Sequence, residues 1–219
     1  MIPLYTYDGL VDYMTKISAR PNDTDLIDQM PNFILLAQLD LSRRLNIFGT
    51  QKILIGTWGQ GQSTIQLPNL YIRPISLTFY DPRSSNEAHV LTYRLNEYAQ
   101  SVTSTNEANG IPSDYSELDV NTLFVTPTPV DLSPNYDGFG FQFIFHELYQ
   151  PLSPTNQSNY FTQRLMDVLS YGALLQMYIY LKDSYYINFY KETLAQAIQD
   201  TLNTDLMNRT DRSANVEVN

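Results

Sequence analysis

The sequence contains no cysteine. A chain without thiols has no disulfide framework, no thiolate ligands for a metal and no cysteine nucleophile. Histidine is almost as scarce, since His89 and His146 are the only two in 219 residues. Neither has a second histidine or a carboxylate at the helical spacing of a metal site. We therefore expect no metal and no cofactor, and we expect stability to come from packing and from partners.

Most catalytic signatures are also missing. There is no nucleophile elbow, no Ser-Lys pair and no phosphate-binding loop, because the glycines at 56–61 precede strand-like sequence and are predicted to form a hairpin turn. A pair of carboxylates could still hydrolyse a glycosidic bond, and the candidate pairs are Glu117 with Asp119 and Glu147 with Asp137. Such pairs occur in any acidic protein, so we favour solvated loop charges and a protein that is not an enzyme.

Lysine and arginine are absent from residues 95–163. The whole chain has 23 acidic and 13 basic residues, a formal charge of −10, and this base-free stretch carries eight of the acids: Glu97, Glu107, Asp114, Glu117, Asp119, Asp131, Asp137 and Glu147. Such a surface repels phosphate backbones, which argues against nucleic-acid binding. It remains compatible with a surface past which DNA slides without adhering.

No hydrophobic run is long enough to cross a membrane. The uncharged stretch 168–181 is shorter than the roughly 20 residues required and contains Ser170 and Gln176, so it is predicted to be a buried core helix. Residues 1–16 carry Asp8 and Asp12 and lack both a basic and an apolar signal region, so nothing suggests secretion.

Helical spacing is present at both ends of the chain. Apolar residues recur every three or four positions over 160–202, which predicts two amphipathic helices folded back on each other at a polar turn, 182–184. A first helix is predicted over 9–19 with Asp8 as its N-cap. A second begins near Asp25, restarts at Pro31 and ends at the basic pair Arg43 and Arg44.

Alternation with period two dominates the middle of the chain. It predicts strands around Ile53 and Ile55, around Ile65 and Leu67, and over 72–79, with two short strands over 115–125. Phe139, Phe141, Phe143 and Phe145 predict a strand with one aromatic face, and 92–102 is predicted to be a short helix. The predicted fold class is α+β, an antiparallel helical bundle made of N-terminal helices and a C-terminal hairpin, with an inserted antiparallel β domain.

This pattern divides the chain into four segments. These are N-terminal bundle helices (1–50), an inserted β-rich region with one short helix (51–159), a helical hairpin completing the bundle (160–202) and a polar tail (203–219). The tail alone cannot bury enough surface to order itself. Its Val216-Glu217-Val218 alternation suits addition to another chain's sheet, and a frayed terminus is an equal alternative.

The order of landmarks resembles the head-to-tail adaptor (connector) family of tailed bacteriophages. The similarity rests on ordered short motifs between about residues 6 and 202: 25–37, 42–45, Gly110-Ile111-Pro112, the prolines at 127 and 129, 151–153, 169–175 and 180–183. The chain departs from the family pattern in the acidic loop at 134–137 and in its long polar tail.

The resemblance implies a non-enzymatic ring of about twelve copies in the virion neck, made in the host cytoplasm. Such a ring docks under the portal protein, extends the DNA channel without binding DNA specifically, and carries a downstream tail or neck protein; it needs no cofactor and no membrane. In that family the C-terminal segment reaches the portal, which makes portal-binding candidates of Leu206, Met207, Arg209, Arg212, Val216 and Val218.

The helical part builds the ring in the same family. The chain has 17 tyrosines and 10 phenylalanines, and a surplus of aromatic residues suits interfaces between subunits. The interface candidates are Arg43, Arg44, Tyr178, Tyr185 and Tyr186. The alternatives are a virion-associated peptidoglycan hydrolase using a carboxylate pair and a tail-tip module that binds surface glycans.

Overall fold

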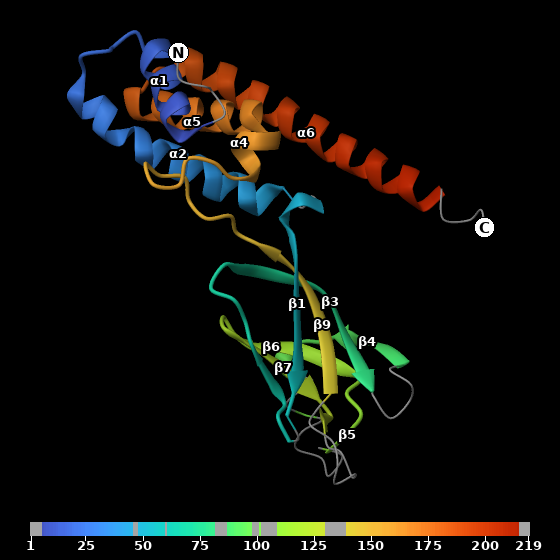
Figure 1. Cartoon of the computed structure of the whole chain (residues 1–219). Helices are drawn as coiled ribbons and strands as arrows, with labels where there is room; N and C mark the ends of the chain where they lie inside the picture. Colours follow the sequence, from blue (N-terminus) through green and yellow to red (C-terminus); the bar gives the residue numbers. More distant parts are fainter. Residues whose placement is uncertain are drawn as a thin grey trace. The chain divides into compact units, whose positions relative to one another are not determined.

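The computed structural model describes residues 6–45, 48–59, 61–81, 87–97, 101, 109–129 and 139–214. These residues form two compact units, which are drawn in Figure 1. The helical unit comprises residues 1–50 and 148–219, and the β unit comprises residues 51–147. The four-segment division proposed above stays a prediction.

The helical unit contains five α-helices among its described residues and one short 3-10 helix. Their bounds are α1 Tyr7–Ile17, α2 Thr24–Arg44, η1 Phe48–Thr50, α4 Tyr160–Arg164, α5 Met166–Leu181 and α6 Ser184–Ala214. Side-chain caps set three of the starts, since Thr6, Asp23 and Asn159 accept hydrogen bonds from backbone N–H groups in the first turns of α1, α2 and α4. The predicted cap Asp8 is instead a first-turn residue, where its charge suits the helix dipole.

Pro31 does not restart a helix. It lies inside α2, which runs without interruption from Thr24 to Arg44. Proline removes one N–H from the helical ladder and usually costs about 3 kcal/mol in a helix interior. Here the flanking residues Met30, Phe33 and Ile34 are buried in the core, so their burial holds the helix together across the missing bond.

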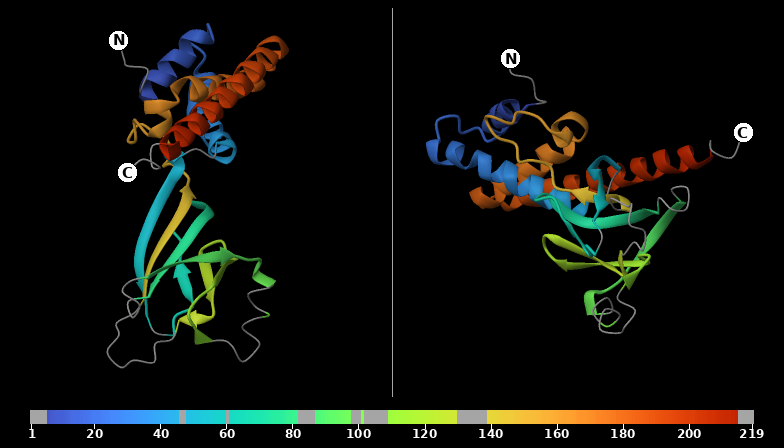
Figure 2. Two further views of the ribbon diagram at one scale, coloured as in Figure 1. Left: turned by 90° about the vertical axis from the view of Figure 1, so that its right-hand side faces the viewer. Right: turned by 60° about the horizontal axis from the view of Figure 1, so that its bottom comes forward.

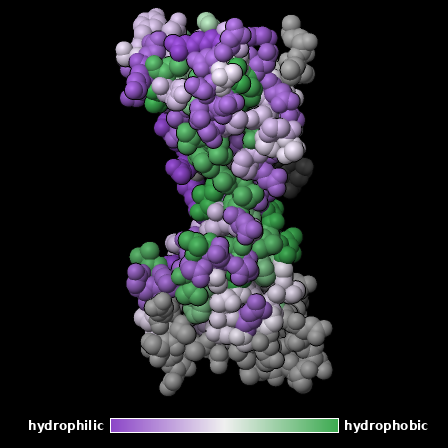
Figure 3. All heavy atoms as spheres, turned by 90° about the vertical axis from the view of Figure 1, so that its left-hand side faces the viewer, coloured by the Kyte–Doolittle hydropathy of each residue, from purple (hydrophilic) through white to green (hydrophobic). Residues whose placement is uncertain are grey.

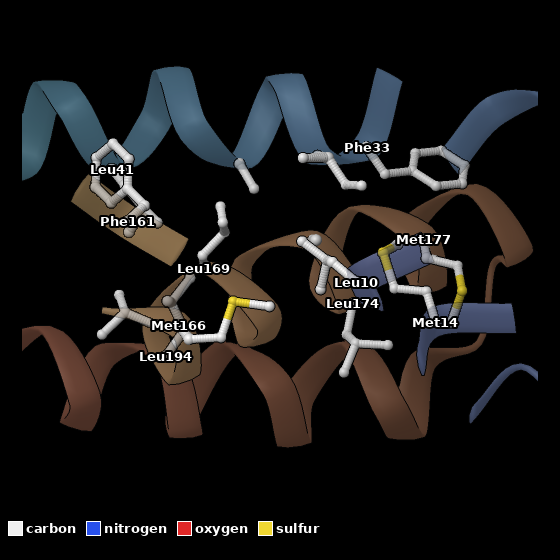
Figure 4. Packing of buried hydrophobic residues seen from close by; sticks show 14 of the residues in the cluster. Leu10, Met14, Phe33, Leu41, Phe161, Met166, Leu169, Leu174, Met177 and Leu194 are labelled. Carbon is white, nitrogen blue, oxygen red and sulfur yellow. The ribbon is translucent and has the colours of Figure 1, made fainter. Parts of the chain in front are cut away.

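The predicted helical bundle is wrong, because α5 itself occupies the centre of the helical unit. Val168, Leu169, Leu174 and Met177 are completely buried, and they point to several sides of α5. Figure 4 shows α2 and α6 on opposite sides of α5, with Met166, Leu169 and Leu174 between them. A helix that is apolar all round is enclosed by its neighbours. The helices are therefore layered on α5 and do not surround a shared bundle core.

The β unit contains nine strands among its described residues. They are β1 Gln51–Trp58, β2 Thr64–Gln66, β3 Tyr71–Asp81, β4 Glu87–Tyr93, β5 Asn109–Gly110, β6 Asp114–Asp119, β7 Thr122–Thr126, β8 Thr128–Pro129 and β9 Phe139–Glu147. Seven form one sheet in the order β1-β9-β3-β4-β6-β7-β2, and β5 pairs with β8. The sheet curls like a barrel so that residues from all seven strands share one core (Figure 2).

The aromatic strand β9 lies between β1 and β3 and is confirmed. Phe139, Phe141, Phe143 and Phe145 are all buried, as the alternation predicted, and they pack with Trp58, whose ring centroid lies 4.8 Å from that of Phe141. Gly56 faces Phe141 across the β1–β9 pair, and a Cβ there would lie 2.7 Å from the ring. The close approach of the phenyl ring explains why residue 56 is a glycine.

Three predictions for the β region are corrected. The sheet is mixed and not antiparallel, because β4 and β6 run parallel, with Thr92 opposite Asp114. The glycines at 56–61 do not close a hairpin, since β1 pairs with β9 while β2 pairs with β7. The predicted helix at 92–102 has the wrong start, because residues 92 and 93 belong to β4, whereas Asn96, Glu97 and Ser101 are helical and part of the range lies outside the described residues. The chain is thus α+β, with a sheet-rich unit that has its own core and with no helical bundle core.

The C-terminal segment is also different from the prediction. The helix does not stop at 202, because α6 continues to Ala214. Side chains support the continuation across residue 202: Gln199 Nε2 donates to Asn203 Oδ1 at 3.1 Å, and Thr204 Oγ1 donates to the Asp200 carbonyl oxygen at 2.8 Å. Val216 and Val218 lie outside the described residues. None of the described helices combines the length and apolar character needed to cross a bilayer.

Candidate assembly surfaces

The last turns of α6 form the first candidate surface. From Asn203 to Asn208 every residue except Asp205 is exposed, and Figure 1 shows this end of α6 extending beyond the other helices of its unit. Leu206 and Met207 are 64% and 67% exposed. Arg209 and Arg212 fall within the same helix. The structure therefore places four of the six portal-binding candidates on one helical end, where Leu206 and Met207 are exposed.

The turn between α5 and α6 carries the tyrosine candidates. Lys182 adopts a left-handed conformation with φ of 57° that ends α5, and Asp183 accepts hydrogen bonds from the N–H groups of Tyr185 and Tyr186. Tyr178 is buried, and its ring stacks on Tyr186 with centroids 4.6 Å apart. Of the three predicted interface tyrosines, Tyr185 is 72% exposed, Tyr186 is partly exposed and Tyr178 belongs to the core.

A groove of about 540 Å³ crosses the helical unit between α2, α5 and α6. We call it the α2–α6 groove. Aliphatic side chains form much of its lining, and charged groups accompany them: Leu36, Leu39, Leu175, Ile179, Ile187 and Leu194, with Asp40, Arg43, Arg44 and Lys191. Arg44 Nε forms an ion pair with Asp40 at 3.0 Å. Both predicted interface arginines thus border a concave apolar surface.

A second groove, of about 900 Å³, lies between α4, the start of α5 and the other side of α6. Its lining is more polar and includes Arg164, Asp167 and Asp200. Burial raises the pKa of Tyr160 there, and the nearby Asp205 carboxylate adds to the effect. Figure 3 shows one face of the molecule, on which hydrophilic residues dominate the helical unit and apolar residues lie between them.

The candidate catalytic carboxylates have structural partners. Glu117 accepts hydrogen bonds from the hydroxyl groups of Tyr71 and Tyr93, while Asp119 accepts from the Asn121 N–H in the β6–β7 turn at 2.7 Å. Burial, followed by the Glu117 contact, raises the pKa of Tyr71. Glu147 lies 3.8 Å from Lys52 Nζ. Asp137 lies outside the described residues.

The two histidines lie in different settings. His89 packs with its ring centroid 6.3 Å from that of Phe79, and His146 is buried in β9. Within the part of the chain that the structure describes, no group of three or more acidic or histidine side chains is arranged to hold a metal ion.

Comparison with known families decides the identity. The profile of the family described as SU10 adaptor protein matches residues 5–218, nearly the whole chain. The chain belongs to the SU10 adaptor protein family. A search of curated proteins found no match.

Membership confirms the resemblance to phage head-to-tail adaptors that the ordered motifs indicated. It gives this adaptor a structural role in a phage particle and contacts with other neck or tail components. The family is one of structural proteins, which accords with the non-enzymatic interpretation.

Sequence reasoning missed the α2–α6 groove. Leu36, Asp40 and Arg43 recur at steps of four and three along α2, and all three line it. That spacing marks a single helix face, which was visible in the sequence. The missing information was that α6 lies across α5 from α2, so that Ile187 and Lys191 complete the groove.

Proposed function

We propose that this adaptor assembles into a ring of about twelve copies that docks beneath the portal protein, extends the DNA channel and presents a platform for a downstream tail or neck protein. The family match carries the proposal. A closed ring needs two different surfaces on each copy, so that each copy meets its neighbours head to tail. We take the arginine-bordered α2–α6 groove and, separately, the exposed turn between α5 and α6 with Tyr185 and Tyr186 as candidate contact surfaces of the ring.

The C-terminal end of α6 is proposed to bind the portal. In proteins most helical stability comes from tertiary packing, and five of the six residues from Asn203 to Asn208 are exposed. Burial of Leu206 and Met207 against a partner would stabilise this segment further. Arg209, Arg212, Val216 and Val218 complete the proposed contact.

The acidic surface is proposed to face the DNA channel or the outer rim of the ring. The described acids of the base-free stretch include exposed Glu97, and negative charge there would repel the DNA backbone. DNA would then pass through the lumen without specific binding, in a virion neck assembled from protein made in the host cytoplasm.

The test is the molar mass of the purified protein by light scattering, alone and mixed with the portal protein of the same phage. We expect a ring of about twelve copies on the portal. Deleting residues 203–219 should abolish portal binding while the far-ultraviolet circular dichroism keeps the signal of the remaining helices. Portal binding that survives the deletion would overturn the role of α6.

A substitution variant tests the apolar contact itself without removing residues 203–219. Replacing Leu206 and Met207 by Asp should weaken portal binding, because charge would replace the apolar contact. The matched control is Ile111→Asp, since Ile111 is also exposed, at 52%, and lies in the β unit. Equal weakening by both variants would show that the effect is not specific to α6.

A further inference from the structure

The α2–α6 groove combines an apolar lining with unneutralised positive charge. Leu36 and Ile179 are about half exposed in it, at 50% and 49%. Arg44 is neutralised by Asp40, whereas Arg43 and Lys191 form no ion pair among the described residues. Its volume falls within the roughly 300–1,000 Å³ of ordinary binding pockets. Such a groove suits a short apolar segment that also carries a negative charge.

The β6–β7 hairpin tip carries the complementary chemistry. Leu118 and Asp119 end β6, and Val120 and Asn121 connect it to β7. Val120 is 84% exposed, the highest value of any large apolar side chain in the described part of the chain. Asp119 is exposed beside it, and the hydrogen bond from the Asn121 N–H to its side chain holds the turn in shape. A rigid tip loses little conformational entropy when it docks.

The groove lies in the helical unit and the tip lies in the β unit, so every copy carries both. One copy can therefore offer its tip while its groove accepts the tip of another copy. We propose that the β6–β7 hairpin tip of one copy docks into the α2–α6 groove of a second copy, with Val120 against the aliphatic lining and Asp119 facing Arg43 and Lys191. Two different surfaces meeting in this way make the heterologous contact that closes a ring. The inference rests on the proposed function and specifies one of its interfaces.

Cross-linking tests the contact directly, because the absence of cysteine leaves no background thiol. Copies carrying Leu36→Cys are mixed with copies carrying Val120→Cys, alone and on the portal protein, and oxidised. We expect a disulfide-linked dimer containing one copy of each kind. The matched control replaces Val120→Cys by Val90→Cys, since Val90 is 71% exposed on β4. Each variant oxidised alone shows any dimer of identical copies.

The strength of the contact gives a second measurement. Val120→Ser should raise the dissociation constant of self-association about tenfold, the loss expected when one buried valine side chain is removed. Val90→Ser should leave it unchanged. Since Val120 is exposed in the single chain, neither substitution removes a core contact.

The outcomes separate the two proposals. Mixed dimers with Val120→Cys, absent with Val90→Cys, support the docking. Rings that form without this selective cross-link, or that form with unchanged strength in Val120→Ser, overturn the docking and leave the ring standing. No oligomer at any concentration, with or without portal protein, overturns both. A selective cross-link without portal binding overturns only the proposed place beneath the portal.

Discussion

Gln38 is a buried amide whose replacement should destabilise the helical unit. It lies on α2 with 1% of its surface exposed. Its Nε2 donates to the carbonyl oxygens of Tyr149 at 3.2 Å and Gln150 at 3.0 Å, and its Oε1 accepts from the Leu152 N–H at 3.2 Å. One side chain thus bonds three backbone groups of residues 149–152, where the chain re-enters the helical unit.

Gln38→Met keeps the length of the side chain and removes all three hydrogen bonds. Each bond contributes about 1 kcal/mol net, and the Gln150 carbonyl keeps another donor, the Asn159 Nδ2 at 3.2 Å. The Tyr149 carbonyl and the Leu152 N–H lose the partner that Gln38 supplied. We therefore expect the free energy of unfolding to fall by about 2–3 kcal/mol.

Gln38→Glu introduces an ionisable group, so its effect on the free energy of unfolding should depend on pH. As a carboxylate it would face two carbonyl oxygens, so burial and these acceptors should raise its folded pKa above the unfolded value of about 4.3. The protonated form can donate to one carbonyl and accept from the Leu152 N–H. The variant should therefore lie nearest to wild type below about pH 4 and lose stability as pH rises through the folded pKa.

The assay is urea unfolding followed by the circular dichroism of the helices, with each variant compared with wild type at the same pH. Gln29→Met is the control, because Gln29 is a partly exposed residue of the same helix that accepts a surface bond from Asn32; it should change stability by less than about 0.5 kcal/mol. The reasoning fails if Gln38→Met matches this control, or if Gln38→Glu is more stable at neutral than at acid pH.

Two further predictions concern close contacts and buried tyrosines. A Cβ on Gly172 would lie 3.2 Å from the Cβ of Ala37 where α5 meets α2, so Gly172→Leu should destabilise the helical unit by about 2–3 kcal/mol in urea unfolding; an unchanged midpoint would refute the close approach. Burial raises the pKa values of Tyr115 and Tyr190 to about 12. Stability should therefore be constant below about pH 10 and fall above it, because unfolded tyrosines ionise first; tyrosinate absorbance that rises in a single step near pH 10 would contradict this.

Local patterns predicted local structure well. The alternation of Phe139 to Phe145 predicted β9 because burial on one face of a strand repeats every two residues. The polar turn after Leu181 predicted the break between α5 and α6. The ordered motifs indicated the adaptor family, which the match over residues 5–218 confirms. Each signal is contained within a short stretch of chain.

Pairing between distant segments could not be predicted in the same way. Glycines at 56–61 suggested a hairpin, yet Gly56 lies within β1 and β1 pairs with β9 almost a hundred residues away along the chain. Which strand a given strand joins depends on which faces the whole core buries. The extension of α6 was missed for a related reason, since the polar residues after 202 contain no helix breaker and composition alone suggested a loose tail.

The sequence by itself determined the chemistry that this adaptor lacks, the regions that form helices and strands, and the family to which it belongs, because composition, periodicity and ordered motifs are properties of the chain. Only the tertiary structure decided that α5 is enclosed by its neighbours, that the sheet is mixed, that Tyr178 is buried while Tyr185 is exposed, and that Arg43 borders an apolar groove. These features depend on which surfaces meet, and that is set by packing free energy summed over residues far apart in the chain.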